Sequence, residues 1–417
     1  RQRQMCIRDS SVAIDGFSLL LALLICGVGF FVSLYAADYL PAKAETGKFY
    51  IYLHGFLLAM LGLVVADNIL VMFVFWELTT LISYLLIGFE CQLESARQNA
   101  RQALLVTGAG GLALLVGFLL LGNIANSYDL SQISLQSGII KADPLYLAVL
   151  VMVFGGSFTK SAQFPFHFWL PNAMTAPTPI SAFLHSATMV KAGIYLLARL
   201  HPILGGTHAW MGTLVVVGGI TALLGSVLAI NASDLKRILA FTTIMALGIL
   251  TMFLGGKTTP ALTAAMTFLM VHSLYKCSLF LVVGIIDHQA GTRMMGRLGG
   301  LLKSMPITAF AAATATLSMA GFPLFFGFIG KEIMYKGALT EDMFPVFATT
   351  AALLANSLMA AVAALLIIKP FLGAARSTPL LPREAPWTMW LGPVFLGGLG
   401  LIFGIVPDWI GRWLIEP

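Results

Sequence analysis

Apolar stretches of about 20 residues recur along almost the whole chain, and short polar segments separate them. A run of that length spans the hydrocarbon core of a bilayer as one α-helix. The tenth stretch is too long for one straight helix and contains GFPLFFGF, so we expect it to be broken there. The pattern predicts about twelve spans, near residues 14–37, 50–66, 69–89, 102–122, 145–163, 180–200, 209–230, 238–255, 260–286, 306–337, 343–368 and 388–406.

Composition supports an all-α polytopic membrane protein. The chain is 59% hydrophobic and 10% charged, with a mean hydropathy of +0.91, whereas soluble domains carry about 25% charged residues. The net charge of +6 is better explained by membrane topology than by nucleic-acid binding. The sequence contains no P-loop, and its cysteines show no paired spacing that would indicate an iron–sulfur, zinc or disulfide framework. We therefore expect no cofactor and no metal. The four cysteines are Cys6, Cys26, Cys91 and Cys277.

Basic residues predict the orientation in the membrane. If residue 14 faces outside, twelve lysines and arginines fall on the inside and five on the outside, which fits the positive-inside rule. The inside set is Lys43, Lys48, Arg97, Arg101, Lys236, Arg237, Arg293, Arg297, Lys303, Lys369, Arg376 and Arg383. The outside set is Lys141, Arg199, Lys257, Lys336 and Arg412.

Four lysines fall within the predicted spans: Lys160, Lys191, Lys276 and Lys331. A cation at the bilayer centre costs at least roughly 2.5–3.5 kcal/mol, so such residues face the protein interior or a wet cavity and have partners. The available partners are Glu77, His185 and His272, which also lie within spans. Two structural alternatives stay open: a lysine near a helix end reaches the headgroups, and a single histidine such as His185 serves packing.

Proline residues interrupt the helices beside two of these lysines. Pro165 follows Lys160, and GFPLFFGF with Pro323 precedes Lys331, 171 residues later. Non-helical backbone at membrane depth occurs where it is buried or lines water, as in the broken helices of transporters. A weaker similarity joins TTLISYLLIGF at Thr79 to TTIMALGILTMF at Thr242, 163 residues on. These offsets predict two five-helix repeats of opposite orientation.

The chain resembles the antiporter-like, proton-translocating subunits of respiratory complex I, membrane-bound hydrogenases and Mrp-type multisubunit sodium/proton antiporters. The resemblance covers residues 12 to 410. Within the family, APTPISAFLHSATMVKAGIYLLAR is most similar to the A-type subunit of Mrp antiporters, since the distal complex I subunit tends to lack a lysine at the position of Lys191. The segments that carry the resemblance, in family order, are FWELTTLISYLLIGF, KSAQFPFHFWLPNAMTAPTPISAFLHSATMVKAGIYLLARL, SDLKRILAFTTIMALG, HSLYKCSLFLVVGIIDH and GFPLFFGFIGKE.

The resemblance implies roles for seven residues on a buried proton path. The family's charged pair falls on Glu77 and Lys160, and its terminal lysine on Lys331. The bridging residues of the family fall on His185, Lys191, His272 and Lys276. The family core has two further helices before the first helix of this chain, and the A-type subunit has a long C-terminal extension, so the sequence is expected to be a fragment or incomplete.

The expected organisation follows from the resemblance and the repeat. Residues 1–11 are an unstructured leader or an artefact, residues 12–49 hold an N-terminal helix, residues 50–205 and 206–370 form the inverted repeats, and residues 371–417 hold a C-terminal helix. Each repeat is expected to form one proton half-channel.

The expected function is that of a proton-translocating subunit in a multisubunit monovalent cation (sodium)/proton antiporter of the cytoplasmic membrane. Its partners would be other membrane subunits, protons, sodium and the lipid bilayer, and not nucleic acid. One alternative is a proton-pumping subunit of complex I, a NADH-quinone oxidoreductase, or of a membrane-bound hydrogenase. Another is a structural scaffold, which the costly buried charges disfavour.

Overall fold

The computed structural model describes residues 12–40 and 45–407. The predicted leader, Lys43 and Arg412 lie outside these residues. The described part of the chain is all α-helical, with no β-strand. Its helices are α1 (Gly16–Tyr39), α2 (Thr46–Val65), α3 (Ile69–Ile87), α4 (Glu94–Ala125), α5 (Leu130–Ser134), α6 (Ser137–Ala142), α7 (Tyr146–Lys160), α8 (Trp169–Asn172), α9 (Thr178–Ser186), α10 (Met189–Leu204), α11 (His208–Asn231), α12 (Leu235–Gly255), α13 (Thr259–Ala290), α14 (Pro306–Ala320), α15 (Phe326–Leu339), α16 (Pro345–Ile367) and α17 (Trp387–Ile405).

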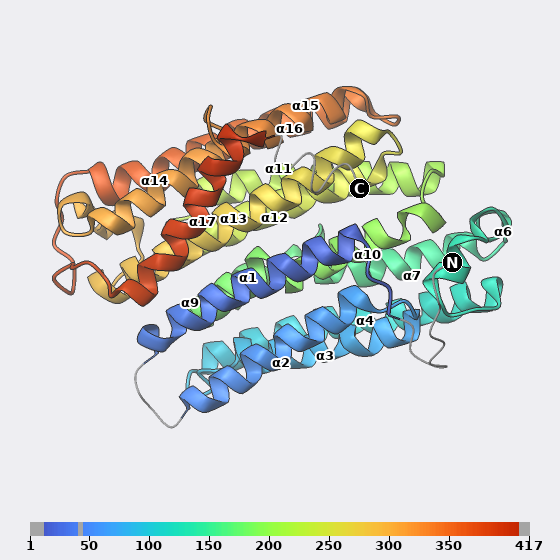
Figure 1. Cartoon of the computed structure of the whole chain (residues 1–417), viewed down its shortest axis with the longest axis horizontal. Coiled ribbons are helices and arrows are strands. Elements are labelled where there is room, and N and C mark those ends of the chain that lie inside the picture. Colours follow the sequence, from blue (N-terminus) through green and yellow to red (C-terminus); the bar gives the residue numbers. More distant parts are fainter. Residues whose placement is uncertain (1–11, 41–44, 408–417) are drawn as a thin grey trace.

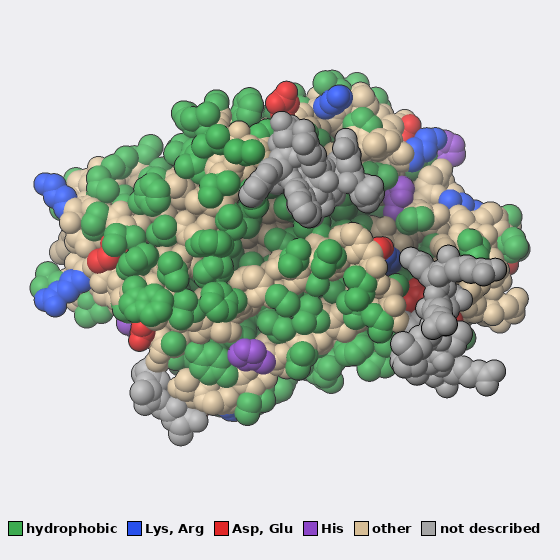
Figure 2. Space-filling view, viewed as in Figure 1, with side chains coloured by type: hydrophobic (Ala, Val, Ile, Leu, Met, Phe, Trp, Pro, Cys, Tyr) green, Lys and Arg blue, Asp and Glu red, His purple; other side chains and the backbone are tan. Residues whose placement is uncertain are grey.

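Ten helical segments in the described residues are long and apolar enough to cross a membrane. In this count α9 and α10 form one segment, and the α7 and α14 helices are apolar but shorter. Apolar side chains cover the flank of the bundle, while charged side chains gather towards its two ends (Figure 2). The protein is therefore a multi-pass membrane protein, as predicted, and the count of about twelve spans stays a prediction.

Local sequence signals fix where several helices begin. Asp15 and Ser18 form a reciprocal capping box at the start of α1. The Asn68 side chain accepts from two backbone N–H groups at the start of α3, and Asp234 caps α12 in the same way. These caps satisfy backbone donors that would otherwise be orphaned at a helix end. The polar segment 123–144, expected to hold a small surface turn, contains the short helices α5 and α6.

Both predicted helix breaks are present. The α7 helix ends at Lys160, and Pro165 lies in the irregular segment before α8. The α14 helix ends at Ala320, and Pro323 lies between it and α15. Each break holds a non-glycine residue with positive φ, Ala162 at 48° and Leu324 at 75°, a conformation that costs on the order of 1–3 kcal/mol. The surrounding packing therefore stabilises both irregular segments.

A third break was not predicted. The expected span 180–200 is divided into α9 and α10, which meet at Ala187 and Thr188. The Thr188 hydroxyl donates to the carbonyl of Phe183, 2.7 Å away, so a side chain satisfies one of the carbonyls near the break. This break separates His185 from Lys191, and helical spacing does not relate their directions.

The helices run lengthwise in a bundle (Figure 1). The α2, α3, α4 and α7 helices lie along one side, and α14, α15 and α16 along the other. The α9, α10, α12 and α13 helices lie between them and are the most buried. All seven predicted site residues lie on α3, α7, the central helices or α15.

Candidate functional site

Lys160, the last residue of α7, lies buried against α3. Its ammonium donates to the Trp76 carbonyl at 3.1 Å and to the Thr80 hydroxyl at 2.7 Å. The Thr80 hydroxyl in turn donates to the same Trp76 carbonyl, 3.2 Å away. The ammonium also lies 4.9 Å from the centre of the Trp76 ring, within cation–π range. Lys160 is thus held by neutral groups on α3.

Glu77 lies between the two α3 residues that hold Lys160. The two side chains are close enough to interact electrostatically, but the described residues contain no ion pair between them within 4.0 Å. One carboxyl oxygen of Glu77 is buried without a hydrogen-bond partner among the described residues. The predicted direct pairing of Glu77 with Lys160 is therefore not seen in this arrangement.

Lys191 and Lys276 are held in the same manner as Lys160. Lys191 donates to the Leu269 carbonyl at 3.1 Å and to the Ser273 hydroxyl, and that hydroxyl donates to the Leu269 carbonyl. Lys276 donates to the Leu239 carbonyl at 3.2 Å and to the Thr242 hydroxyl at 2.5 Å. The Thr242 hydroxyl donates to that same carbonyl.

We call each such arrangement a lysine cradle: a helix carbonyl and a hydroxyl one turn later, both accepting from one ammonium. The three lysine cradles are Trp76 with Thr80, Leu269 with Ser273, and Leu239 with Thr242. An ammonium has three N–H donors, so a cradle leaves one donor free for water or a proton acceptor. Because both acceptors are neutral, the cradle also accommodates the uncharged amine.

Two lysine cradles are related by the offset predicted from the sequence. Trp76 and Leu239 are 163 residues apart (239 − 76), the same separation as Thr79 and Thr242. The position equivalent to Glu77 in the second cradle is Ala240 (77 + 163), which carries no charge. The offset agrees with the predicted repeat, whose boundaries stay a prediction.

Both histidines are buried between charged neighbours. The ring nitrogens of His185 and His272 have no hydrogen-bond partner among the described residues. Lys191 and Lys276 are the charged neighbours of His272. The His185 ring lies 6.4 Å from the ring of Trp169, whose indole N–H donates to the Thr159 carbonyl beside Lys160. A buried imidazole without partners can bind either a proton or a water molecule.

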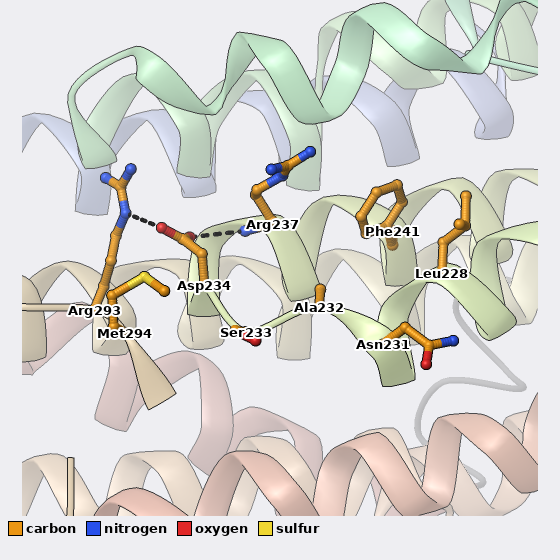
Figure 3. A pocket seen from close by; sticks show the side chains of 9 residues that line it. All are labelled: Leu228, Asn231, Ala232, Ser233, Asp234, Arg237, Phe241, Arg293 and Met294. Atoms are coloured by element: carbon orange, nitrogen blue, oxygen red, sulfur yellow. Dashed lines mark hydrogen bonds and ion pairs between the residues drawn. The ribbon is translucent and has the colours of Figure 1, made fainter. Parts of the chain in front are cut away.

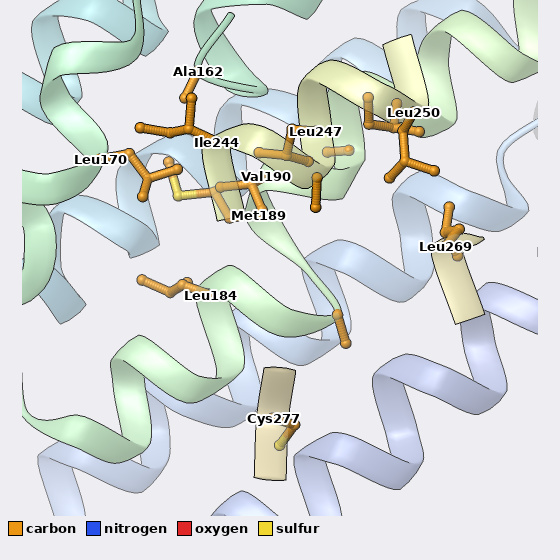
Figure 4. Packing of buried hydrophobic residues seen from close by; sticks show 14 of the residues in the cluster. Ala162, Leu170, Leu184, Met189, Val190, Ile244, Leu247, Leu250, Leu269 and Cys277 are labelled. Carbon is orange, nitrogen blue, oxygen red and sulfur yellow. The ribbon is translucent and has the colours of Figure 1, made fainter. Parts of the chain in front are cut away.

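Apolar side chains close the break between His185 and Lys191. Leu184, Met189 and Val190, on both sides of the break, belong to one buried cluster with Ile244 and Leu247 of α12 (Figure 4). A passage lined in this way stays dry unless water enters transiently.

Lys331 lies apart from the three lysine cradles, near the start of α15. Its half-buried side chain donates to the Ala320 carbonyl, 2.7 Å away at the end of α14. The side chain packs against Gly321, where an added Cβ would lie 2.5 Å from it. The second break thus supplies the acceptor for Lys331, as its sequence position predicted. That all seven residues form one continuous line stays a prediction.

Sequence reasoning missed Lys236. It was placed in an inside loop, but it lies in the first turn of α12, is 2% exposed and donates to the Ala176 carbonyl at 3.0 Å. That carbonyl is in the irregular segment before α9. The neighbouring Arg237 made the stretch look like a charged loop, and no sequence signal separated the two residues.

The largest pocket among the described residues lies elsewhere, at the α11–α12 turn (Figure 3). Its volume is about 600 Å³. Asp234 accepts from the Arg293 guanidinium at 2.5 Å beside it. None of the seven predicted residues lines it. No three histidine, cysteine, aspartate or glutamate side chains come together as metal ligands within residues 12–40 and 45–407.

A family model described as "NADH:quinone oxidoreductase/Mrp antiporter, TM" matches residues 66–359. This match contains all seven predicted residues and all three lysine cradles. The chain belongs to this family. The family assignment agrees with the resemblance seen in the sequence.

Curated relatives narrow the position of the chain within the NADH:quinone oxidoreductase/Mrp antiporter family. It is 41% identical to the A-type subunit of the Na(+)/H(+) antiporter of Alkalihalophilus pseudofirmus, over 98% of this chain and 54% of that protein. It is 43% identical to the A/B-type subunit of a probable K(+)/H(+) antiporter of Rhizobium meliloti, over 95% of this chain and 40% of that protein. The chain thus spans about half the length of the curated relatives it matches.

Solved structures agree with the family. A chain in the Mrp complex from Dietzia sp. DQ12-45-1b matches with a TM-score of 0.90 and 35% identity, over 98% of this chain and 46% of that chain. A chain of an archaeal membrane-bound sulfane sulfur reductase matches with a TM-score of 0.87 at 22% identity, over 97% of this chain and 82% of that chain. The second match concerns the fold alone.

Proposed function

We propose that this chain is the proton-translocating part of a multisubunit monovalent cation (sodium)/proton antiporter in the cytoplasmic membrane. The observation that carries the proposal is the set of lysine cradles, three buried amines held by neutral acceptors, in a chain whose relatives are named as antiporter subunits of the A type. Other membrane subunits would be its partners, because its structural relative belongs to a complex. Complex I or hydrogenase membership has less support, since the relatives named above carry antiporter names.

The proposed path begins at Glu77 and Lys160. An ionised Glu77 stabilises the protonated form of the nearby amine, and a neutral Glu77 removes that stabilisation. The Lys160 cradle holds the amine in place in both forms, because its two acceptors are uncharged. A change of charge on Glu77 is therefore converted into proton loading or release at Lys160.

The middle of the proposed path uses histidines between lysines. His185 precedes the break, Lys191 follows it, and His272 and Lys276 share a face of α13, four residues apart. Each step moves one proton from a protonated nitrogen to a neutral one, directly within about 3 Å or through water. Lys331 is the proposed end of this row.

Lys160 gives the sharpest test. We expect Lys160→Ala to abolish sodium-dependent proton movement in membrane vesicles that hold the assembled complex. Lys160→Arg should fail as well, because a guanidinium does not release its proton in proteins. The exposed Lys336 on α15 supplies the matched control, and Lys336→Ala should transport normally. Native gels of the same vesicles report assembly. Normal transport by assembled Lys160→Ala would disprove the proposed path.

A further inference from the structure

Glu341 is a buried carboxyl group that the proposed path does not use. It lies in the turn between α15 and α16 and is 4% exposed. Neither of its carboxyl oxygens has a hydrogen-bond partner among the described residues. An ionised carboxylate buried in this way is costly unless it is paired, hydrogen-bonded or neutralised. The structure pairs it with nothing, so its stable form is neutral.

The donors around Glu341 are directed elsewhere. Its carboxyl group lies against Gly256 in the α12–α13 turn, where an added Cβ would be 2.7 Å from both oxygens. The Gly256 carbonyl bonds the His201 ring at 2.9 Å. The backbone N–H of Lys257 donates to Asp342 at 3.2 Å. No neighbour therefore stabilises a negative charge on Glu341 by hydrogen bonding.

The charged groups facing this carboxyl come from three elements. Asp342 is its neighbour in the same turn and is exposed, Lys257 is exposed in the α12–α13 turn, and His201 reaches the turn from α10. Burial, and then the negative charge of Asp342, raises the pKa of Glu341 to about 7. The group therefore changes charge near neutral pH and is one residue away from water.

Glu341 also lies at the far end of the helix that begins beside Lys331. The two residues are ten positions apart, about 15 Å along a helix. Asn356 of α16 lies between them: it is buried, its amide donates to the Met334 sulfur at 3.0 Å, and its amide oxygen has no partner among the described residues. Buried polar atoms without partners therefore occur at an intermediate step as well as at the end.

We propose that Glu341 is the outer proton-exchange site of this chain, which takes up the proton that leaves Lys331 by way of Asn356 and releases it to water beside Asp342. This inference rests on the proposed function for its direction of flow. The outer position follows from the predicted orientation, in which Lys257 and Lys336 face outside. At each turnover the Glu341 carboxylate gains one proton from the inner side and loses one to the outer side, so the site returns to its starting charge.

Infrared difference spectroscopy tests the proton at Glu341 without any transport. Spectra of the assembled complex at pH 5 and pH 9 should differ by a carboxylic acid C=O band that titrates near neutral pH. Glu341→Gln should remove this band. Glu332, exposed on α15, gives the matched control, and Glu332→Gln should keep it. A band that persists in Glu341→Gln would show that Glu341 does not exchange a proton and would overturn the inference.

Transport then tests the role of that proton. Glu341→Gln should slow sodium-dependent proton movement in vesicles by on the order of a hundredfold, the usual contribution of a positioned proton carrier, while Glu332→Gln has no effect. Normal transport by assembled Glu341→Gln would overturn the exchange site. If Lys160→Ala stops transport in the same preparation, that result would leave the proposed function intact. If Lys160→Ala transports normally, the proposed function fails independently of Glu341.

Discussion

At the level of single residues, the sequence predicted the buried amines better than their surroundings. Lys160, Lys191 and Lys276 were identifiable because a cation within an apolar stretch is costly. Their hydroxyl partners were not, since serine and threonine are common in membrane helices and bond their own backbone, as Thr79 and Thr80 both do. Only the folded arrangement shows which hydroxyl also receives an ammonium.

The pair of neighbouring threonines allows a controlled test of the lysine cradle. Thr80 accepts from Lys160, whereas Thr79 bonds the same Trp76 carbonyl without being bonded to the lysine. A hydrogen bond to a charged group contributes about 1.5–3 kcal/mol, so Thr80→Val should slow proton movement by roughly tenfold to a hundredfold. Thr79→Val should transport at nearly the normal rate. Equal rates in the two variants would show that the hydroxyl does not hold the amine.

At the level of helices, proline explains what was predicted and its absence explains what was not. Pro165 and Pro323 marked two breaks because proline removes a backbone donor and clashes with the preceding turn. The break at Ala187 and Thr188 contains neither proline nor glycine, and a hydroxyl satisfies part of its backbone instead. Tertiary packing of the central helices sets this break, so helical spacing gave a wrong geometry for His185 and Lys191.

The α4 helix separates the two ends of the first charged pair. Its adjacent glycines approach both sides: an added Cβ at Gly111 would lie 1.8 Å from a Glu77 oxygen, and one at Gly110 would lie 1.8 Å from the Thr159 hydroxyl beside Lys160. The backbone of α4 therefore limits the positions open to Glu77. Nothing in the sequence distinguished these glycines from others in the same helix.

This close approach predicts a strong effect from one methyl group. Gly111→Ala should displace Glu77 and impair transport about as severely as Glu77→Gln, with the complex still assembled. Gly108, in the same helix, has no atom within 4 Å of an added Cβ. Gly108→Ala should therefore behave like the unmodified protein in the same vesicle assay. If both alanine variants transport equally well, the position of Glu77 is not set by α4.

At the level of the whole molecule, hydrophobic pattern was enough for the fold class and not for every charge. The apolar stretches and the two proline breaks correspond to helices and breaks in the structure. Lys236 and Glu341 were not recognised as buried, because each lies at the end of a helix next to exposed charged residues. Burial at helix ends depends on how turns pack against neighbouring helices, which hydropathy does not report.

The stability of the whole molecule should carry the signature of Glu341. Because its pKa is raised from 4.5 to about 7, ionising it in the folded state costs free energy. This cost is absent below pH 4.5, grows between pH 4.5 and 7, and is constant above, reaching roughly 3 kcal/mol. Thermal unfolding should therefore show Glu341→Gln gaining stability relative to the unmodified protein as pH rises from 4.5 to 7.

Measuring the difference between the two proteins cancels the other titrating groups. Glu332→Gln should show no such pH-dependent difference, since Glu332 is exposed. A Glu341→Gln difference that is flat from pH 4.5 to 9 would mean that the carboxyl group titrates normally in the folded protein.

The apolar packing between His185 and Lys191 bears on how the membrane keeps its energy. A permanent file of water across a membrane protein would let protons run down the gradient without any exchange for sodium. In this structure Leu184, Met189 and Val190 interrupt such a file at its centre. On the proposed path, leak and transport therefore depend on the same event, the brief wetting of one short apolar gap. A substitution that keeps this gap wet would give a protein that conducts protons freely and stores nothing.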